Sequence, residues 1–181
     1  MTTIGEHTID LSLLPESAHI LDLGCRGFDF TNHFKNLGHN VFSVDCDLLK
    51  GADYYWLAIT DRDGLVGIER NSDPQGTRIK EGSEVMGMKL ESFSKLAKVD
   101  FWDVIKFDIE GAEYQVIMSL TEAPAKQLSI EFHTHTGIYG TREVERMEKK
   151  LYQLGYKQIQ HKKEARHGLQ ANWWDSLFVL E

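Results

Sequence analysis

Short apolar runs alternate with amphipathic stretches along the chain, which is typical of a parallel β-sheet with crossover helices. The spacing of apolar residues predicts helices over 30–37, 90–97, 112–120 and 141–154. Strands are expected at 19–23, 41–45, 54–60, 104–108, 127–132, 156–160 and 176–180. Because no helix-sized pattern separates the last two strands, they should pair antiparallel at a sheet edge. The expected fold class is α/β: a mostly parallel seven-stranded sheet with helices on both faces and an antiparallel C-terminal edge hairpin.

The pattern weakens between residues 65 and 89, where Gly, Asp, Ser and Pro74 interrupt short apolar pieces. Long segments of this kind within a compact domain are often functional. We interpret this one as an inserted hairpin or a mobile surface loop, and not as a linker between domains. The 181 residues should then form a single domain, 1–181, because a domain commonly has ~150 residues.

Composition excludes several classes of protein. The net charge of −8 argues against non-specific nucleic-acid binding, which needs a basic surface. No apolar stretch approaches the ~20 residues that span a bilayer, and the first residues do not form a signal peptide. The two cysteines cannot by themselves build a disulfide framework or a zinc site. We therefore expect a cytoplasmic protein without a nucleic-acid or membrane partner.

Polar residues stand directly after several of the predicted strands. In open α/β sheets, ligands bind beyond the carboxyl ends of the strands, near the point where the strand order reverses. The candidate positions are Asp22 with 24–27, Asp45, Thr60 with Asp61, Asp108 with Glu110, and Glu131 with His133 and His135.

The first of these groups, residues 22–27 (Asp-Leu-Gly-Cys-Arg-Gly), lets the backbone turn sharply and come close to a ligand. It is not the complete G-x-G-x-x-G fingerprint. Asp45 follows this glycine turn. The number of residues between them is close to the ~20 expected for an acid that binds ribose hydroxyls. Together these features favour a nucleoside-bearing cofactor; the alternative is a glycine turn followed by an acidic cap at the surface.

Two kinds of nucleoside cofactor fit this pattern. A dinucleotide carries a pyrophosphate, which favours a glycine-rich turn that opens directly into a helix. S-Adenosyl-L-methionine carries a cationic sulfonium and suits an acidic pocket, which Asp22, Asp45, Asp61 and Asp108 would supply. Arg26 could pair with the methionine carboxylate or lie on the surface.

Residues 104–117 (Val-Ile-Lys-Phe-Asp-Ile-Glu-Gly-Ala-Glu-Tyr-Gln-Val-Ile) resemble the signature of the FkbM family of S-adenosylmethionine-dependent methyltransferases. That family typically shows a Lys-x-Asp-x-Glu-Gly-x-Glu core after its fourth strand, which residues 106–113 match. Segments 58–64, 88–93 and 175–179 resemble the family's turn after the third strand, its short helix entry and its final strand. The resemblance covers nearly the whole chain.

The resemblance implies a Rossmann-like class I methyltransferase fold with S-adenosyl-L-methionine as cofactor. After the first strand the family usually has Asp-x-Gly-Ala-Asn-x-Gly, whereas this chain has its second glycine one position earlier and Arg26 in place of Asn. The residues that we expect to bind the cofactor are Asp22, Gly24, Cys25, Arg26, Gly27, Asp45, Thr60, Asp61 and Asp108.

The implied reaction is methyl transfer to a hydroxyl of a small-molecule or glycan acceptor, such as a carbohydrate or a secondary metabolite. A hydroxyl is a poor nucleophile, so a base within reach should help by ~10²–10⁴-fold. The candidates are His133, Glu110 and Asp108, in that order, because much of an unperturbed histidine is neutral at pH 7. Glu110 could instead cap the helix that follows it.

Glu131, His133 and His135 alternate, so in an extended segment they share one face. They could bind a metal ion together with Asp108, or form a polar rim of the active cleft; we assign no metal ligand. Lys106 lies on the same side of its strand as Asp108 and is expected to have a carboxylate partner.

Two other functions are compatible with the pattern. A nicotinamide-dependent oxidoreductase could share this fold, although the displaced glycine counts against it. A module that binds S-adenosylmethionine without turnover is the second alternative. The short segment before residue 19 leaves little room for an N-terminal cap, so a second subunit of a homo-oligomer, or a large acceptor, is expected to complete the cleft.

Overall fold

The computed structural model describes residues 1–50, 53–70, 77–134, 137–165 and 172–181, with side chains except at 161–165 and 172–174. Its main sheet has seven strands in the order β11-β12-β10-β9-β3-β4-β5. Their bounds are β3 His19–Leu23, β4 Asn40–Asp45, β5 Tyr55–Trp56, β9 Trp102–Phe107, β10 Ala125–His133, β11 Tyr156–Ala165 and β12 Asn172–Leu180.

Five neighbouring strands of this sheet, from β10 to β5, run parallel. β12 is antiparallel to both of its neighbours, β10 and β11. The mostly parallel sheet and the antiparallel C-terminal hairpin are thus confirmed. From β3 the chain passes to β4 on one side and returns to β9 on the other, so the switch point, where ligands bind in such sheets, lies at the carboxyl end of β3.

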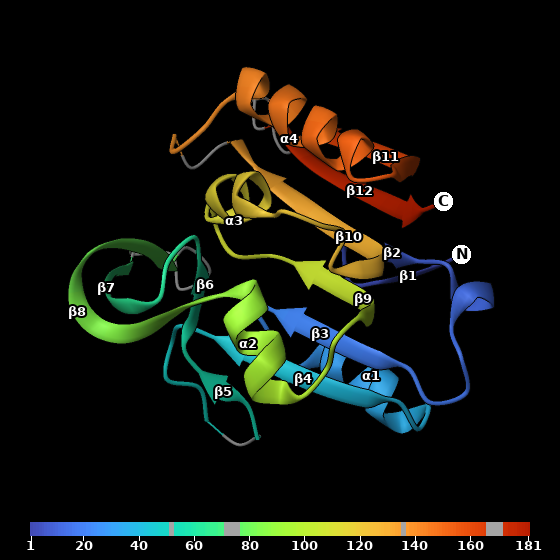
Figure 1. Cartoon of the computed structure of the whole chain (residues 1–181), viewed down its shortest axis with the longest axis horizontal. Helices are drawn as coiled ribbons and strands as arrows, with labels where there is room; N and C mark the ends of the chain where they lie inside the picture. Colours follow the sequence, from blue (N-terminus) through green and yellow to red (C-terminus); the bar gives the residue numbers. More distant parts are fainter. Residues whose placement is uncertain (51–52, 71–76, 135–136, 166–171) are drawn as a thin grey trace.

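Helices cover both faces of the sheet, as expected (Figure 1). Because successive strand residues point to opposite faces, Leu21 and Ile105 join the larger core with α2, α3 and α4, whereas Ile20 and Val104 join the core with α1. The helix bounds are α1 Asp29–Asn36, α2 Leu90–Ala97, α3 Glu113–Ser119 and α4 Thr141–Gln153, with a 3-10 turn, η1, at Leu11–Leu13.

The prediction of one strand over 54–60 is wrong, because the backbone turns within it. The N–H of Leu57 donates to the carbonyl oxygens of Asp45 and Tyr55, both at 3.1 Å. β5 therefore ends at Trp56 in the main sheet, and β6 (Ala58–Thr60) belongs to a second sheet. That sheet has the order β6-β8-β7.

The segment of weak pattern contains a long antiparallel hairpin of β7 (Gly64–Arg70) and β8 (Thr77–Lys89). It lies at the left of Figure 1, on the side toward which the carboxyl ends of β3 and β9 point. Leu65 and Met86 face each other in its register but are 57% and 47% exposed. The pattern of apolar residues between 65 and 89 is weak because much of the hairpin lies outside the core.

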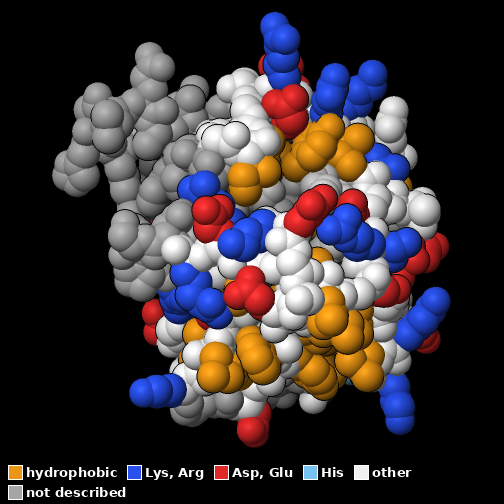
Figure 2. Space-filling view, turned by 90° about the vertical axis from the view of Figure 1, so that its left-hand side faces the viewer, with side chains coloured by type: hydrophobic (Ala, Val, Ile, Leu, Met, Phe, Trp, Pro, Cys, Tyr) orange, Lys and Arg blue, Asp and Glu red, His pale blue; other side chains and the backbone are white. Residues whose placement is uncertain are grey.

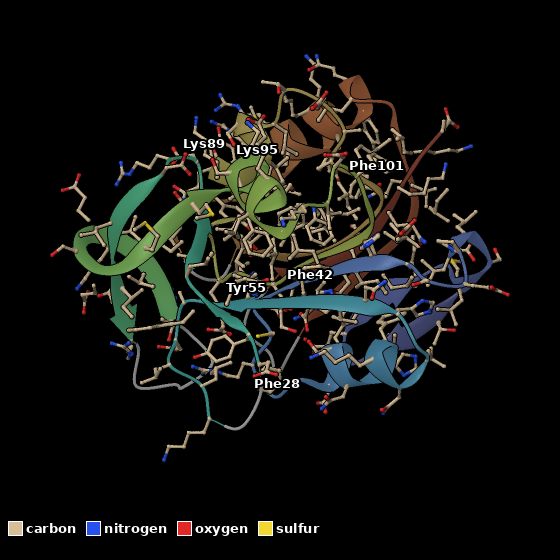
Figure 3. All side chains as sticks on the ribbon, turned by 60° about the horizontal axis from the view of Figure 1, so that its bottom comes forward. Phe28, Phe42, Tyr55, Lys89, Lys95 and Phe101 are labelled. Carbon is tan, nitrogen blue, oxygen red and sulfur yellow. The ribbon has the colours of Figure 1, made fainter. Side chains whose placement is uncertain are left out.

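An aromatic layer between the sheet and α2 holds the short strand β5 in place. The rings of Phe42 and Tyr55 stack with centroids 6.5 Å apart, and Figure 3 shows them on neighbouring strands. Tyr55 also meets Phe93 of α2 edge-on at 5.1 Å. This packing fixes the end of β4, where Asp45 stands.

The N-terminal segment forms a small hairpin, β1 (Thr2–Ile4) with β2 (His7–Ile9), that the sequence did not predict. Gln127 of β10 fastens it: its side chain accepts the N–H of Asp10 at 2.9 Å and donates to the carbonyl oxygen of Asp10 at 3.1 Å. His7 is thereby buried against β10. None of the described helices has the length and apolar character needed to cross a membrane.

Candidate active site

The turn after β3 brings the ends of three strands together. The N–H groups of Gly24 and Cys25 donate to the carbonyl oxygen of Val44 in β4, at 2.9 and 3.3 Å. Gly24 has a φ of +77°, and a Cβ at this position would lie 1.8 Å from the carbonyl oxygen of Asp108, after β9. Only glycine fits here, because any side chain would collide with backbone.

Asp22, a predicted cofactor residue, is fully buried and makes its contacts within the protein. Its Oδ1 accepts from Lys106 Nζ at 3.0 Å and its Oδ2 from the Thr31 hydroxyl at 2.6 Å. Lys106 also donates to the carbonyl oxygen of Gly24 at 2.7 Å, and Thr31 shares a 2.7 Å hydrogen bond with Ser43. We call Asp22, Thr31, Ser43 and Lys106 the Asp22 network. The predicted carboxylate partner of Lys106 is confirmed.

Asp45 ends β4 and is 8% exposed. Burial raises its pKa, and its Oδ1 accepts the N–H of Asp47 at 2.8 Å. Asp47 in turn binds Arg26 Nη2 at 2.5 Å, Arg70 Nε at 2.9 Å and the Thr77 hydroxyl. Arg26 is therefore paired with Asp47, and the β7–β8 hairpin is attached to the loop after β4.

The remaining predicted cofactor residues lie near these strand ends. Cys25 is 1% exposed, and burial raises the pKa of its thiol. Gly27 completes the turn with a φ of +78°. Thr60 ends β6, where its hydroxyl donates to Asp61 Oδ1 at 3.2 Å, and Asp61 is exposed. The cofactor roles of these residues stay predictions.

The three predicted candidates for the general base lie together. His133 Nε2 is 3.4 Å from Asp108 Oδ1 and 3.9 Å from Glu110 Oε2. The side chain of His133 is only 3% exposed, whereas those of Asp108 and Glu110 are 28% and 21% exposed. The two carboxylates are thus more accessible to a ligand than the imidazole is.

Glu113 holds His133 from the buried side. Its Oε1 lies 2.8 Å from His133 Nδ1 and accepts the N–H of Ile109 at 3.0 Å. Its Oε2 accepts the N–H of Gly111 at 2.9 Å and the hydroxyl of Tyr139 at 3.0 Å. The same hydroxyl accepts the N–H of His133 at 2.7 Å. These contacts fix the imidazole with Nε2 directed at Asp108 and Glu110.

Two further side chains, from β2 and β10, join this group. His7 Nδ1 shares a 3.1 Å hydrogen bond with the Ser129 hydroxyl, and its Nε2 lies 3.7 Å from Asp108 Oδ2. Glu131 Oε1 lies 3.7 Å from His133 Nε2. We call His7, Asp108, Glu110, Glu131 and His133 the Asp108 cluster. His135, which the sequence places on the same face, lies outside the described residues.

The carboxylates of the cluster differ in acidity. Burial raises the pKa of Glu110 to about 7 and the pKa of Glu131 to about 8. Burial would also raise the pKa of Asp108, but the charge of Lys106, 3.2 Å away, holds it well below its usual value. Asp108 is therefore the carboxylate that stays ionised most readily.

The two imidazoles differ as well. Burial lowers the pKa of His7, so its ring is neutral near pH 7. Burial would also lower the pKa of His133, but Glu113 and Asp108 raise it well above the ordinary value. His133 therefore carries a proton that its carboxylate neighbours stabilise.

Sequence reasoning missed His7 and gave no role to Glu113 or Tyr139. Glu113 carries a detectable signal, because it is the last acid of the motif at 106–113. No pattern in the sequence marks His7 or Tyr139. Each joins the site only because a separate segment packs against β10 or α3.

Several of the solved structures that this chain resembles are named as methyltransferases. The likeness to the fibrillarin pre-rRNA processing protein of Methanococcus jannaschii has a TM-score of 0.53 at 10% identity, over 97% of this chain and 70% of that one. A TehB-like SAM-dependent methyltransferase from Corynebacterium glutamicum has a TM-score of 0.49 at 15% identity, over 94% and 84%.

A third structure is 1,6-didemethyltoxoflavin-N1-methyltransferase from Burkholderia thailandensis, with its substrate and S-adenosylhomocysteine bound. Its TM-score is 0.46 at 13% identity, over 92% of this chain and 72% of that one. A comparison of the sequence with curated proteins finds no match.

The strand order and the likeness to the fibrillarin structure define the class of the fold, that of the Rossmann-like class I methyltransferases. The family model of the methyltransferase FkbM domain matches residues 27–157. The chain belongs to the FkbM methyltransferase family. It is an S-adenosylmethionine-dependent methyltransferase, and its cofactor is S-adenosyl-L-methionine.

Proposed function

We propose that this protein binds S-adenosyl-L-methionine across the carboxyl ends of β3 and β4 and methylates a hydroxyl group of a carbohydrate or secondary metabolite. The close approach at Gly24 supports the first part, because it brings the backbone turn after β3 against the end of β9 at the switch point. The buried carboxylate of Asp45 at the end of β4 suits two ribose hydroxyls. Figure 2 views the molecule from this side, where acidic and basic side chains intermix across the middle of the surface.

The Asp108 cluster is the single observation that supports a hydroxyl acceptor. A hydroxyl must lose a proton as it is methylated, and the cluster brings acceptors of that proton to the end of β9, beside the turn at Gly24. We favour Glu110 for this role, since its carboxylate is accessible while His133 is enclosed by Glu113 and Tyr139. This changes the order of candidates that the sequence suggested.

Each part of the site has a distinct task in the proposed reaction. When bound, S-adenosyl-L-methionine would supply an electrophilic methyl group on its sulfonium sulfur, with S-adenosylhomocysteine as the leaving group. Glu110 takes the hydroxyl proton. Asp45 and the turn at 24–27 hold the ribose and the reacting end in line, and such positioning contributes up to ~7–11 kcal/mol in favourable cases.

Calorimetric titration with S-adenosylhomocysteine tests the cofactor site. We expect one molecule to bind, and Asp45→Ala to remove binding while Asp53→Ala, an exposed acid nearby, leaves it unchanged. If both variants bind like the parent protein, the ribose assignment is wrong.

Transfer of a 13C-labelled methyl group to a panel of sugars and hydroxylated metabolites tests the reaction. The product should show the carbon shift of an O-methyl group, and Glu110→Gln should lower turnover by ~10²–10⁴-fold without weakening S-adenosylhomocysteine binding. A methylated nitrogen or carbon in the product would contradict the proposal. Cofactor binding without transfer to any acceptor would favour a non-catalytic module.

A further inference from the structure

We propose that His7, Asp108 and Glu131, with His133 beside them, bind one divalent transition-metal ion of the first row, of the Mn²⁺, Fe²⁺, Co²⁺ or Zn²⁺ type. The sequence analysis assigned no metal ligand, and the site requires a residue, His7, that it gave no function. Binding of the ion does not depend on the proposed function; only its part in the reaction does.

His7, Asp108 and Glu131 are close enough to one another to share one ion, and His133 lies beside two of them. The Nε2 of His7 is 3.7 Å from Asp108 Oδ2, and the Nε2 of His133 is 3.4 Å from Asp108 Oδ1 and 3.7 Å from Glu131 Oε1. One ligand atom each from His7, Asp108 and Glu131 lies within 4.8 Å of the others. Ligands about 2.1 Å from an ion are separated by about 3.0 Å at right angles and about 4.2 Å when opposite.

His7 provides an independent sign of a missing ligand. Its side chain is 4% exposed, and its Nε2 is buried without a hydrogen-bond partner. The 3.7 Å to Asp108 Oδ2 is longer than a hydrogen bond. A buried polar atom without a partner is costly and uncommon. A metal ion between the imidazole and the carboxylates would satisfy it.

The second nitrogen of each imidazole is already held in the manner of a metal-binding histidine. The second ring nitrogen of a metal-binding histidine usually makes a hydrogen bond to a carboxylate or another fixed oxygen, which orients the ring. The Nδ1 of His133 meets Glu113 at 2.8 Å, and the Nδ1 of His7 meets the Ser129 hydroxyl at 3.1 Å. In both rings Nε2 faces the cluster: the neutral ring of His7 offers it as a ligand directly, whereas His133 would first lose its proton.

The charges around the site favour a cation. Asp108, Glu110, Glu113 and Glu131 bring four acidic groups together. The positive charge of Lys106 is near Asp108, but Asp108 shares it with Asp22, whose Oδ1 lies 3.0 Å from Lys106 Nζ. Among the described side chains, the acids of the site outnumber the bases. Grouping like charges in a buried position is unfavourable unless a cation lies between them.

The donor set indicates the class of ion. An imidazole nitrogen combined with two carboxylates suits a first-row transition metal better than Mg²⁺ or Ca²⁺, which prefer oxygen ligands. Asp108 is the accessible member, at 28% exposed, so a further ligand can enter beside it. If the proposed function holds, that ligand is the acceptor oxygen, which the ion would polarise while Glu110 takes the proton.

The site is tested by titrating MnCl2 into protein that carries no histidine tag and has been treated with a chelator. We expect one Mn²⁺ per chain by calorimetry and by loss of the free-ion electron paramagnetic resonance signal. His7→Ala and the near-isosteric Glu131→Gln should each weaken binding at least tenfold, since even outer-shell changes cost ~10–100-fold. His19→Ala, an exposed histidine at the amino end of β3, is the matched control and should bind like the parent protein.

A crystal of the unaltered protein grown with MnCl2 keeps the test independent of how the variants fold. An anomalous peak between His7 Nε2 and Asp108 supports the site. Lack of binding at about 1 mM Mn²⁺, Co²⁺ and Zn²⁺, or binding that survives both cluster variants, overturns it. S-Adenosylhomocysteine binding by the chelated protein is measured in parallel, so that failure of the metal site is distinguished from failure of the proposed function.

Discussion

Two buried polar groups, the Asp22 network and the Asp108 cluster, meet at Lys106 but differ in how well their atoms are paired. In the network, hydrogen bonds of 2.6–3.0 Å join Asp22 to Thr31 and Lys106. In the cluster, the two imidazole Nε2 atoms lie 3.4 and 3.7 Å from Asp108, and that of His7 has no hydrogen-bond partner. Because buried polar groups are normally hydrogen-bonded, the first group is complete without a ligand, while the second is arranged to receive one.

The largest expected effect comes from Lys106→Met, which breaks the complete group. It leaves the fully buried Asp22 carboxylate without its cation, and removing one member of a buried pair typically costs ~3–5 kcal/mol. The free energy of unfolding in urea measures this loss. Lys157→Met is the control, because its pair with Glu181 is exposed, and it should change stability by less than ~1 kcal/mol. Equal effects would show that the Asp22 network is not a special source of stability.

Gly24→Ala tests the contact that brings the two groups together. The new Cβ would collide with the Asp108 carbonyl oxygen, whereas at Gly38, which has a similar φ of +88°, nothing lies within 4 Å. Both variants place an alanine in a left-handed backbone, which destabilises each of them. The difference between their free energies of unfolding therefore measures the effect of the collision. We expect Gly24→Ala to cost ~1–3 kcal/mol more than Gly38→Ala in urea unfolding, and it alone should weaken S-adenosylhomocysteine binding.

Tyr139→Phe removes the support of His133 without touching the cluster itself. The lost hydroxyl leaves an oxygen of the buried Glu113 and the N–H of His133 with one partner fewer. Such losses cost ~1–3 kcal/mol of unfolding free energy. Tyr152→Phe removes an exposed hydroxyl that is 3.3 Å from Gln158 and should be within ~0.5 kcal/mol of the parent. If the two phenylalanine variants are equally stable, Glu113 does not need Tyr139.

The smallest effect is expected from Arg70→Ala, which loosens the hairpin from Asp47. The Arg70 side chain is 54% exposed, and exposed ion pairs contribute only ~0.2–1 kcal/mol. Asp47 keeps its contact with Arg26 at 2.5 Å. Thermal unfolding should therefore shift little, with Arg62→Ala, also exposed, as the control. A loss above ~2 kcal/mol would mean that the hairpin stabilises the strand ends.

Much of the candidate site was within reach of the sequence because it follows regular strands. Asp108 and His133 stand at the ends of adjacent parallel strands, so their proximity follows from the strand order once that order is known. The strand over 54–60 failed as a prediction because a turn at Leu57, and not a change of composition, divides it. Asp22 stays a predicted cofactor residue, but its pairing with Lys106, 84 positions away in the chain, was visible only in the structure.

By itself, the sequence determined the class of fold and the motif at 106–113, because alternating apolar runs and the spacing of acids along one strand are local properties. Only the tertiary structure decided which polar atoms are paired. Whether Asp22 is satisfied, and whether His7 Nε2 is left without a partner, depends on β9 and on a hairpin that reaches β10 from the other end of the chain. Contacts between distant segments have no periodic trace in the sequence, so packing alone gave His7 its place beside Asp108.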